Sequence, residues 1–343
     1  MVDLIFFKYL VKDKVMIYKK WIGIDVSKDK LDISIFDGNS HSALQILNSR
    51  KSITSYFKKV VNKSEYHVTM EATGVYHRIL FATLVTLEFD CSVVNPYRIK
   101  KFSEMKMIRA KTDSVDAKII AEYGCEQKPI LSTLPSKCQM EIITIFKAME
   151  SYQKLVTSLR NQMLALRSCE SEVTLVIKAY QKTIKDNRII IRKFEDRIKE
   201  IVLANYEEVY KRLLEIPGIG PKNSSLILGY FGKFEGFDSV KQVVSFVGIN
   251  PHPKTSGTSV RGRSNISKRG NPVFRKMLYL AALSAKRYNP DCILYYESLL
   301  ARGMKKKKAL IAVAHKLLRQ VFAVVKYDRT WVRDYRKNCL TLT

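Results

Sequence analysis

The fold is decided by residues 21–36, which read WIGIDVSKDKLDISIF. The run 21–26 is apolar apart from Asp25 near its end, and residues 31–36 alternate between apolar and polar side chains. Alternation with a period of two is typical of a β-strand that is buried on one face. The polar residues 27–30 between the two runs are typical of a turn. The stretch therefore predicts a β-hairpin with Asp25 at the end of its first strand.

The residues that follow extend this hairpin into an α/β domain. Further elements are expected from apolar periodicity, namely strands at 66–71 and 91–94 and helices at 76–89 and 111–123. Strands that alternate with helices are typical of an α/β fold. We therefore expect an α/β domain at residues 18–135, preceded by an N-terminal extension at 1–17.

Residues 136–208 form a second region, which is predicted to be helical. Apolar residues recur there with strict spacings of three and four in two runs, first at Ile142, Ile145, Met149, Tyr152, Val156, Leu159, Met163 and Leu166, and then at Val173, Ile177, Tyr180, Ile184, Asn187, Ile191, Phe194, Ile198 and Ile201. Heptads sustained over such lengths predict a coiled coil, in which Asn187 would fix the register. The runs either fold back on each other as an antiparallel hairpin or pair between subunits; a plain helical core packed on a neighbouring domain is the alternative.

The third region, residues 209–330, begins with the turn signal LLEIPGIGPK at 213–222. A helix, two glycines spaced by one apolar residue and a second helix are typical of a helix-hairpin-helix. Gly218 and Gly220 would permit a tight turn whose N–H groups approach a phosphate; alternatively, the turn only packs two helices together. Mostly α-helical structure follows, with helices expected at 272–287, 291–301 and 304–326, and a tail at 331–343.

The net charge points to a polyanionic partner. The chain holds 60 Lys and Arg against 32 Asp and Glu, a formal charge of +28. Residues 251–343 contribute +17 of this excess, and residues 239–290 contain no Asp or Glu. A surface cleared of carboxylates suits a phosphate backbone, so nucleic acid is the expected partner. With 46% hydrophobic residues the chain is also rich enough in apolar side chains to exclude wholesale disorder.

Cysteine and hydropathy patterns bound the cellular setting. The six cysteines are scattered and form no Cys-x-x-Cys pair, which argues against a zinc site or a disulfide framework. Reduced thiols suit a cytoplasmic protein. No apolar run reaches the roughly 18 residues that a membrane span needs, so we expect no membrane association.

Four acids form a candidate metal site. Asp25 and Glu71 end predicted strands, while Asp113 and Asp116 are three residues apart on a predicted helix and so share one face. Converging carboxylates bind hard cations such as Mg²⁺ or Mn²⁺, and two such ions stabilise both oxygens of a phosphodiester exchange. Taken singly, each acid is better explained as a helix cap or a surface residue, and Asp113 could cap the helix that it opens, so only the set points to a metal site.

The motifs around these acids resemble those of a known family. The segments IGIDVSK at 22–28, MEATG at 70–74 and KTDSVDA at 111–117 are similar to the three acidic motifs of the DEDD transposases, the RuvC-like recombinases of the IS110 insertion-sequence family. The C-terminal transposase domain of that family resembles residues IPGIGP at 216–221, FVGI at 246–249, Ser256-Gly257 and ISKRGN at 266–271. Together the motifs cover about residues 19–326 in the family's order.

The resemblance implies a mechanism and partners. It implies a RuvC-like, RNase-H-like first domain that holds Mg²⁺ on Asp25, Glu71, Asp113 and Asp116. It implies a coiled coil used in oligomerisation, with a homodimer or homotetramer expected. Members use a structured non-coding bridge RNA to select donor and target DNA, which places the protein in a bacterial or archaeal cytoplasm, associated with the nucleoid when acting.

By motif match the nucleophile is Ser256, which would become covalently joined to DNA. It begins the Gly/Ser/Arg-rich stretch near residues 255–270, expected to be an exposed loop, and Ser259, Ser264 and Ser267 are rival serines. The family pattern often has a second glycine after Ser-Gly, whereas Thr258-Ser259 follow here. The predicted nucleic-acid-binding residues are Gly218, Gly220, Lys222, Arg261, Arg263, Lys268, Arg269, Arg275 and Lys276.

The sequence thus predicts a DNA transposase or recombinase that cleaves and rejoins strands through a 5′-phosphoserine intermediate. One alternative is a metal-dependent endonuclease of the Holliday-junction type, in which the acids activate water and Ser256 is idle. Another is a non-catalytic scaffold that binds nucleic acid through its basic surface.

Overall fold

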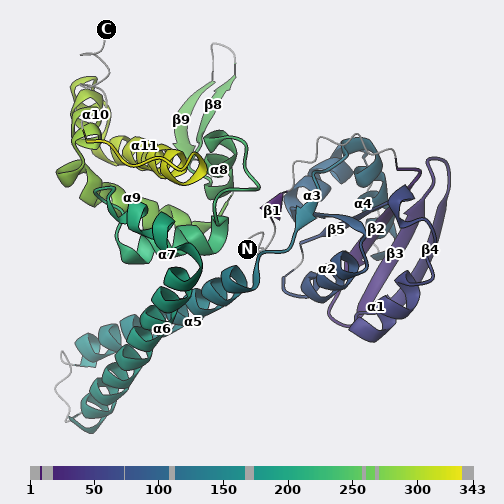
Figure 1. Ribbon diagram of the computed structural model, residues 1–343, viewed down its shortest axis with the longest axis horizontal. Coiled ribbons are helices and arrows are strands. Elements are labelled where there is room, and N and C mark those ends of the chain that lie inside the picture. Colours follow the sequence, from purple (N-terminus) through teal and green to yellow (C-terminus); the bar gives the residue numbers. More distant parts are fainter. Residues whose placement is uncertain are drawn as a thin grey trace. The chain divides into compact units, whose positions relative to one another are not determined.

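The chain divides into two compact units, Met1–Pro135 and Ser136–Thr343. The computed structural model describes residues 8–9, 18–72, 74–107, 113–166, 174–256, 260–266 and 270–333. The first unit is built on a five-stranded sheet, and the second is mainly helical (Figure 1).

The sheet of the first unit has the strand order β4-β3-β2-β5-β6. Its strands are β2 (Lys20–Val26), β3 (Lys30–Phe36), β4 (His41–Leu47), β5 (Tyr66–Glu71) and β6 (Asp90–Val94). The first three strands form an antiparallel meander, while β5 and β6 run parallel to β2. The predicted hairpin and the strands at 66–71 and 91–94 are confirmed. The edge strand β4 was not predicted, because most of its side chains are polar or exposed and its pattern does not alternate cleanly.

Two helices cover each face of this sheet. Helices α3 (Pro96–Met105) and α4 (Asp113–Gln127) lie on one face, and α1 (Arg50–Phe57) and α2 (His77–Thr86) lie on the other (Figure 1). The helices expected at 76–89 and 111–123 are confirmed as α2 and α4. The shorter α1 and α3 were missed, although each begins with a recognisable cap, at Ser49 and at Asn95 before Pro96.

Short elements complete the first unit. A 3₁₀ turn, η2 (Lys63–Glu65), precedes β5. The two-residue strand β1 (Lys8–Tyr9) pairs antiparallel with β7 (Ser132–Thr133). This pairing attaches part of the predicted N-terminal extension to the end of the α/β unit.

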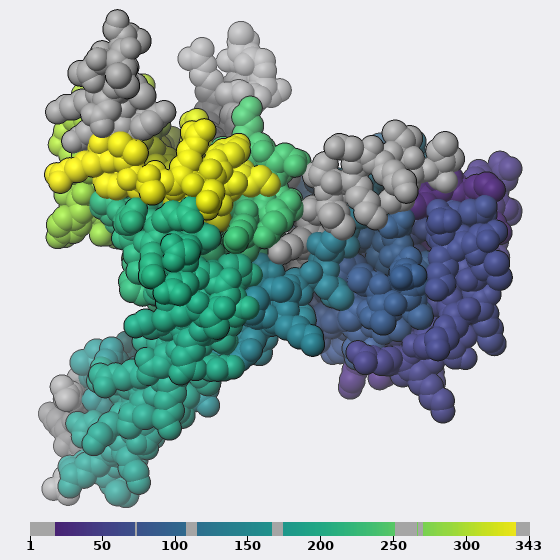
Figure 2. All heavy atoms as spheres, in the orientation of Figure 1, coloured from purple at the N-terminus to yellow at the C-terminus, as the bar shows by residue number. Residues whose placement is uncertain are grey.

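The second unit begins with a long helical hairpin. Helix α5 (Lys137–Leu166) runs antiparallel to α6 (Thr174–Leu214), since Tyr152 contacts Phe194 with ring centroids 5.7 Å apart and Arg197 pairs with Glu141 at 2.8 Å. The space-filling view shows the two helices packed along each other (Figure 2). The two predicted runs are therefore helices that fold back on each other within one chain.

Asn187 occupies the buried side of α6, as its place in the second run predicts. Its side chain is only 7% exposed, and its Nδ2 donates to the Thr183 carbonyl of the same helix at 2.8 Å. The amide is thus satisfied by the backbone of its own helix, which limits the cost of burying it.

The remaining helices pack around an aromatic cluster. They are α7 (Pro221–Phe231), α8 (Val240–Val247), α9 (Pro272–Tyr288), α10 (Pro290–Ala301) and α11 (Lys306–Lys326). Phe231 contacts the rings of Phe234, Phe237, Phe246 and Phe274. The helices expected at 272–287, 291–301 and 304–326 are confirmed.

The expectation of an exposed loop near 255–270 is corrected by the structure. Residues Pro251–Ser256 form β8 and Val260–Ile266 form β9, an antiparallel pair with an irregularity between His252 and Lys254. Both segments are mostly polar, so no alternation of apolar side chains revealed them.

Two further expectations concern membranes and thiols. Among the helices that the structure describes, none combines the length and apolarity that crossing a bilayer requires. The described cysteines Cys91, Cys125, Cys138 and Cys292 are free thiols.

A buried histidine makes the first unit sensitive to acid. His67 in β5 is 2% exposed, and its Nε2 lies 2.8 Å from Ser92 Oγ in β6. Burial lowers the pKa of His67 from 6.5 to about 4, because the charged ring would lose its hydration. The neutral ring therefore belongs to the folded state.

We predict that the free energy of unfolding falls as the pH is lowered from 6.5 towards 4, because the unfolded chain binds a proton at His67 that the folded chain does not. The loss attributable to this group is about 3 kcal/mol below pH 4, of which about 2 kcal/mol is lost between pH 7 and pH 5. Urea unfolding of wild type and His67→Gln at pH 7, 6 and 5 measures it. Equal pH dependence in both proteins would contradict the prediction.

Candidate active site

The carboxyl ends of β2 and β5 bring two of the predicted acids together. The strands are adjacent and parallel, with Ile24 opposite Met70. Asp25 and Glu71 each follow directly after this pair in the sequence. They are therefore neighbours at the same edge of the sheet.

Both acids lie on the face that α4 covers. A Cβ added to Gly23 would meet the backbone of Ala117 and Ala121 in α4 at 2.2 Å, and one added to Gly124 of α4 would meet Thr69 Oγ1 at 2.5 Å. Gly23 and Thr69 thus face α4. Side chains alternate between the faces of a strand, so Asp25 and Glu71, two residues further along, face the same way.

Helix α4 supplies the remaining two acids at its start. Asp116 directly precedes Ala117, whose carbonyl oxygen lies against Gly23. Asp113 is the first residue of α4, and its side chain lies outside the described ones. The topology thus brings Asp25, Glu71 and the first turn of α4 to one edge of the sheet.

The donor set is chemically suited to a hard divalent cation. All four predicted ligands are carboxylates, whose oxygens Mg²⁺ and Mn²⁺ prefer. Within the described part of the chain, no group of three or more His, Cys, Asp and Glu side chains is arranged to hold a metal ion. The match to the metal therefore rests on the donor chemistry and the strand register.

A fifth acid, which the sequence motifs did not indicate, lies beside this set. Asp32 in β3 lies directly opposite Asp25, and its Oδ1 accepts a hydrogen bond from Gln45 Nε2 at 2.8 Å. Like charges directly opposite each other destabilise a sheet. The alternation Leu31-Asp32-Ile33 was the available signal, since it places Asp32 on one face of the strand that pairs with Asp25.

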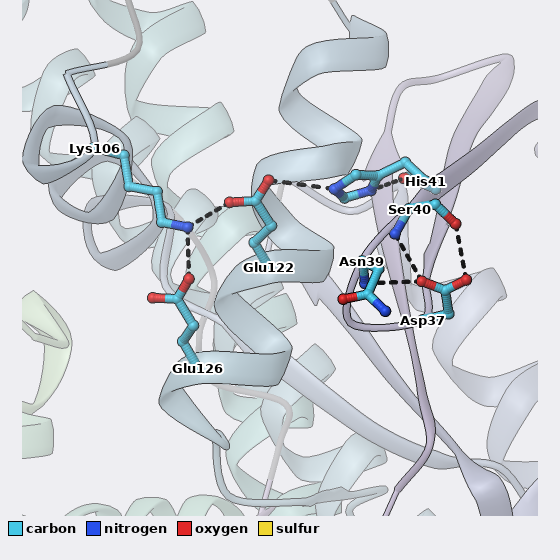
Figure 3. A network of polar contacts seen from close by, with 8 residues as sticks. Asp37, Asn39, Ser40, His41, Lys106, Glu122 and Glu126 are labelled. Atoms are coloured by element: carbon cyan, nitrogen blue, oxygen red, sulfur yellow. Dashed lines mark hydrogen bonds and ion pairs between the residues drawn. The ribbon is translucent and has the colours of Figure 1, made fainter.

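A polar network holds the second half of α4. Glu122 Oε1 lies 3.3 Å from His41 Nε2, and its Oε2 lies 2.6 Å from Lys106 Nζ (Figure 3). Lys106 also pairs with Glu126 at 2.5 Å, and the hydrogen bonds that its ammonium donates to the two carboxylates raise the pKa of Lys106. The network ties α4 to the end of α3 and to β4.

The turn before His41 is held by a carboxylate. Asp37 Oδ1 accepts hydrogen bonds from the N–H groups of Ser40 at 2.7 Å and Asn39 at 2.9 Å (Figure 3). These bonds, led by that of Ser40, lower the pKa of Asp37 to about 2. The turn between β3 and β4 therefore keeps its form down to acidic pH.

The two glycines of the predicted helix-hairpin-helix have different surroundings. Gly218 has a φ of +105°, and a Cβ there would lie 2.8 Å from the Cβ of Ala285 in α9. Gly218 is therefore needed for the turn to pack against α9, which agrees with a packing role for this turn. Gly220 precedes Pro221 as the N-cap of α7, and a Cβ there would meet nothing within 4 Å. The open side of the turn is thus at Gly220 and the α7 N-terminus.

Three of the predicted basic residues have described side chains. Lys222 lies 3.9 Å from Glu195, and its pKa is lowered mainly by loss of hydration, with a smaller contribution in the same direction from the charge of Lys276. Arg275 donates to the Val247 carbonyl at the end of α8 at 3.1 Å, and burial lowers its pKa. Arg275 therefore caps a helix, whereas the side chains of Lys222 and Lys276 are exposed.

The predicted nucleophile lies at the end of β8 from which the chain continues to β9. Ser256 is the last residue of β8 and pairs with Val260 at the start of β9. Arg261 and Arg263 follow in β9. Their side chains and that of Ser256, together with the whole of Lys268 and Arg269, lie outside the described parts.

Models of known protein families match residues in both units. Residues 22–167 match the DEDD family of IS110 elements, described as "Transposase", and residues 210–297 match the "Transposase IS116/IS110/IS902 family". The chain belongs to the IS110 transposase family. The family resemblance inferred from the motifs is confirmed.

Relatives of this transposase extend over nearly its whole length. It is 27% identical over 320 residues to the "Pilin gene-inverting protein" of Moraxella lacunata, covering 91% of this chain and 97% of the relative. The protein of the same name from Moraxella bovis has the same identity and coverage. The "Transposase for insertion sequence element IS1111A" of Coxiella burnetii is 22% identical, with 91% of each chain covered.

We predict that Gly23→Ala destabilises this transposase by about 3 kcal/mol, because the new methyl group meets rigid backbone atoms of α4. Displacing α4 also moves Asp113 and Asp116 away from the strand ends. Thermal unfolding measures the effect. Gly220→Ala is the control, since its Cβ enters open space. A Gly23→Ala protein as stable as wild type would contradict the close packing of α4.

Proposed function

We propose that this transposase cleaves and rejoins DNA through a 5′-phosphoserine intermediate on Ser256. In this proposal Asp25, Glu71, Asp113 and Asp116 bind Mg²⁺ or Mn²⁺. The observation that carries it is the parallel register of β2 and β5, which sets Asp25 beside Glu71 on the face covered by α4. A structural role for the acids alone does not require Asp25 and Glu71 to lie side by side at one sheet edge.

The bound cations would supply a Lewis acid for the scissile phosphate and lower the pKa of an attacking hydroxyl. The residues of the chain do the rest. The carboxylates position the ions, and close contact between Gly23 and α4 keeps the two pairs of acids in a fixed relation. Basic residues of the second unit, Lys222 and Lys276 among them, hold the DNA backbone.

The proposed strand exchange conserves the number of phosphodiester bonds. The Ser256 oxygen attacks phosphorus and forms a phosphoserine ester, while the bond from phosphorus to the 3′ oxygen breaks. The serine proton is lost to a base or to solvent, and the leaving 3′ oxygen takes up a proton. The 3′-hydroxyl of another strand then attacks the phosphoserine and releases the serine. One phosphodiester is lost and one is formed, so no nucleotide cofactor is consumed.

The finer fold assignments and partners belong to the same proposal. We assign the first unit to the RNase-H-like, RuvC-like class, the α5–α6 hairpin to a coiled coil that supports a dimer or tetramer, and the turn at Gly218–Gly220 to a helix-hairpin-helix. A bridge RNA selects donor and target DNA. The charge of +28 supports two nucleic-acid partners, because each phosphate contact calls for a cation. The names of the relatives, which denote transposition and gene inversion, fit an exchange of strands.

Wild type is expected to form a protein–DNA adduct with a nicked DNA that lacks a rejoining hydroxyl, and Ser256→Ala is expected to form none. Denaturing gel electrophoresis of end-labelled DNA detects the adduct. Ser264→Ala in β9 is the matched control and should retain it. Hydrolysed nicks without any adduct in wild type would favour a junction endonuclease, and an adduct that persists in Ser256→Ala would overturn the assignment.

Asp25→Asn is expected to reduce strand cleavage by at least roughly 100-fold, because a metal ligand is lost, while DNA and RNA binding change less than about threefold. Cleavage over a Mg²⁺ titration and filter binding without the metal measure the two effects. Asp29→Asn, in the exposed turn after β2, is the control. Unchanged cleavage in Asp25→Asn would remove this acid from the site.

A further inference from the structure

Exposed apolar side chains gather beside the acids. The structure describes nine exposed large hydrophobic side chains in the first unit, and five of them lie at the edge where β2, β4, β5 and β6 end: Leu47, Val75, Tyr76, Ile79 and Tyr97. Exposed apolar side chains that gather at one edge of a domain mark a candidate site of interaction. We call these five residues the apolar edge.

Tyr76 is fixed on one side of the strand ends. It is the N-cap residue of α2 and follows Glu71 by five positions. Asn48 Nδ2 donates to the Tyr76 carbonyl at 3.3 Å and to the Ser27 carbonyl after β2 at 2.9 Å. The backbone that carries Tyr76 is thereby tied to the turn that follows Asp25. Its side chain is nevertheless 40% exposed.

Tyr97 lies on the other side of Glu71. Val94 of β6 pairs with Glu71, and the chain then enters α3, where the Tyr97 N–H donates to Asn95 Oδ1 at 2.9 Å. This ring is also 40% exposed, and Lys101 Nζ lies 5.7 Å from its centroid. The end of β5 therefore lies between two strand-end tyrosines, one leading into each helix layer.

Cations accompany the apolar edge. Lys28 and Lys30 are exposed in the turn after Asp25, and Arg98 is exposed next to Tyr97. Rings that stack on bases, interleaved with cations that bind the backbone, are typical of surfaces for single-stranded nucleic acid. The edge thus offers rings that can stack and cations that can bind phosphates, a combination that suits an unpaired strand.

We propose that the apolar edge stacks on unpaired bases of the DNA strand that enters the acid site, with Tyr76 and Tyr97 as the stacking residues. The identity of this strand as the reaction substrate rests on the proposed function. The edge would select DNA that is unpaired beside the scissile phosphate, because a base within a duplex cannot present its face to a ring.

The test uses the full chain and a branched DNA with a four-nucleotide unpaired segment, in which 2-aminopurine replaces each unpaired base in turn. Ca²⁺ replaces Mg²⁺ so that the strands stay intact. Wild type is expected to quench the probe at one or two positions. Tyr76→Ala and Tyr97→Ala are each expected to lose this quenching and to bind the branched DNA roughly 5- to 100-fold more weakly. Tyr76→Phe, which keeps a ring, is expected to retain both.

Tyr288→Ala is the matched control, because its ring is 68% exposed and lies at the end of α9 in the second unit. Unchanged quenching in the Tyr76→Ala, Tyr97→Ala double variant would overturn the proposal. Quenching that occurs only with an RNA strand, or only with a fully paired duplex, would overturn it as well. Adduct formation is measured separately. Tyrosine-dependent quenching without an adduct would reject the phosphoserine mechanism alone, whereas an adduct without such quenching would reject the stacking edge alone.

Discussion

The contact between Gly23 and α4 is the constraint on which the acid site depends. With no side chain at this position, the backbone of Ala117 and Ala121 lies directly on β2. Any larger residue would hold the helix away from the sheet. Because Asp25 follows Gly23 by two residues and Asp116 precedes Ala117 by one, the same contact that packs the core also sets the separation of the acids.

The other end of α4 is fixed by charge. The pairs that Lys106 makes with Glu122 and Glu126, and the approach of His41 to Glu122, join the helix to α3 and β4. Glu122 and Glu126 thus stabilise the packing of α4. Asp25 and Asp32, in contrast, lie directly opposite each other on the neighbouring strands β2 and β3. Like charges directly opposite each other destabilise a sheet, so the two groups of acids differ in their effect on the fold.

Two glycines of the second unit, Gly218 and Gly220, have different roles. Gly218 lets the turn approach α9, while Gly220 leaves the start of α7 open. Arg275 donates a hydrogen bond to the carbonyl at the end of α8, whereas the side chains of Lys222 and Lys276 are exposed. Residue type alone did not separate these roles, because each depends on which helix end or backbone atom lies nearby.

The sequence by itself determined the β-hairpin at 21–36, the two heptad runs, the helices expected at 272–287, 291–301 and 304–326, and the family. All of these depend on local periodicity or on residues close in the chain. Tertiary structure alone decided that the heptad runs pair within one chain, that residues 251–256 pair with 260–266, that Asp32 lies opposite Asp25, and that tyrosines at the starts of α2 and α3 flank the end of β5. These depend on strand register and helix packing, which join residues far apart in sequence and leave no periodic signal in it.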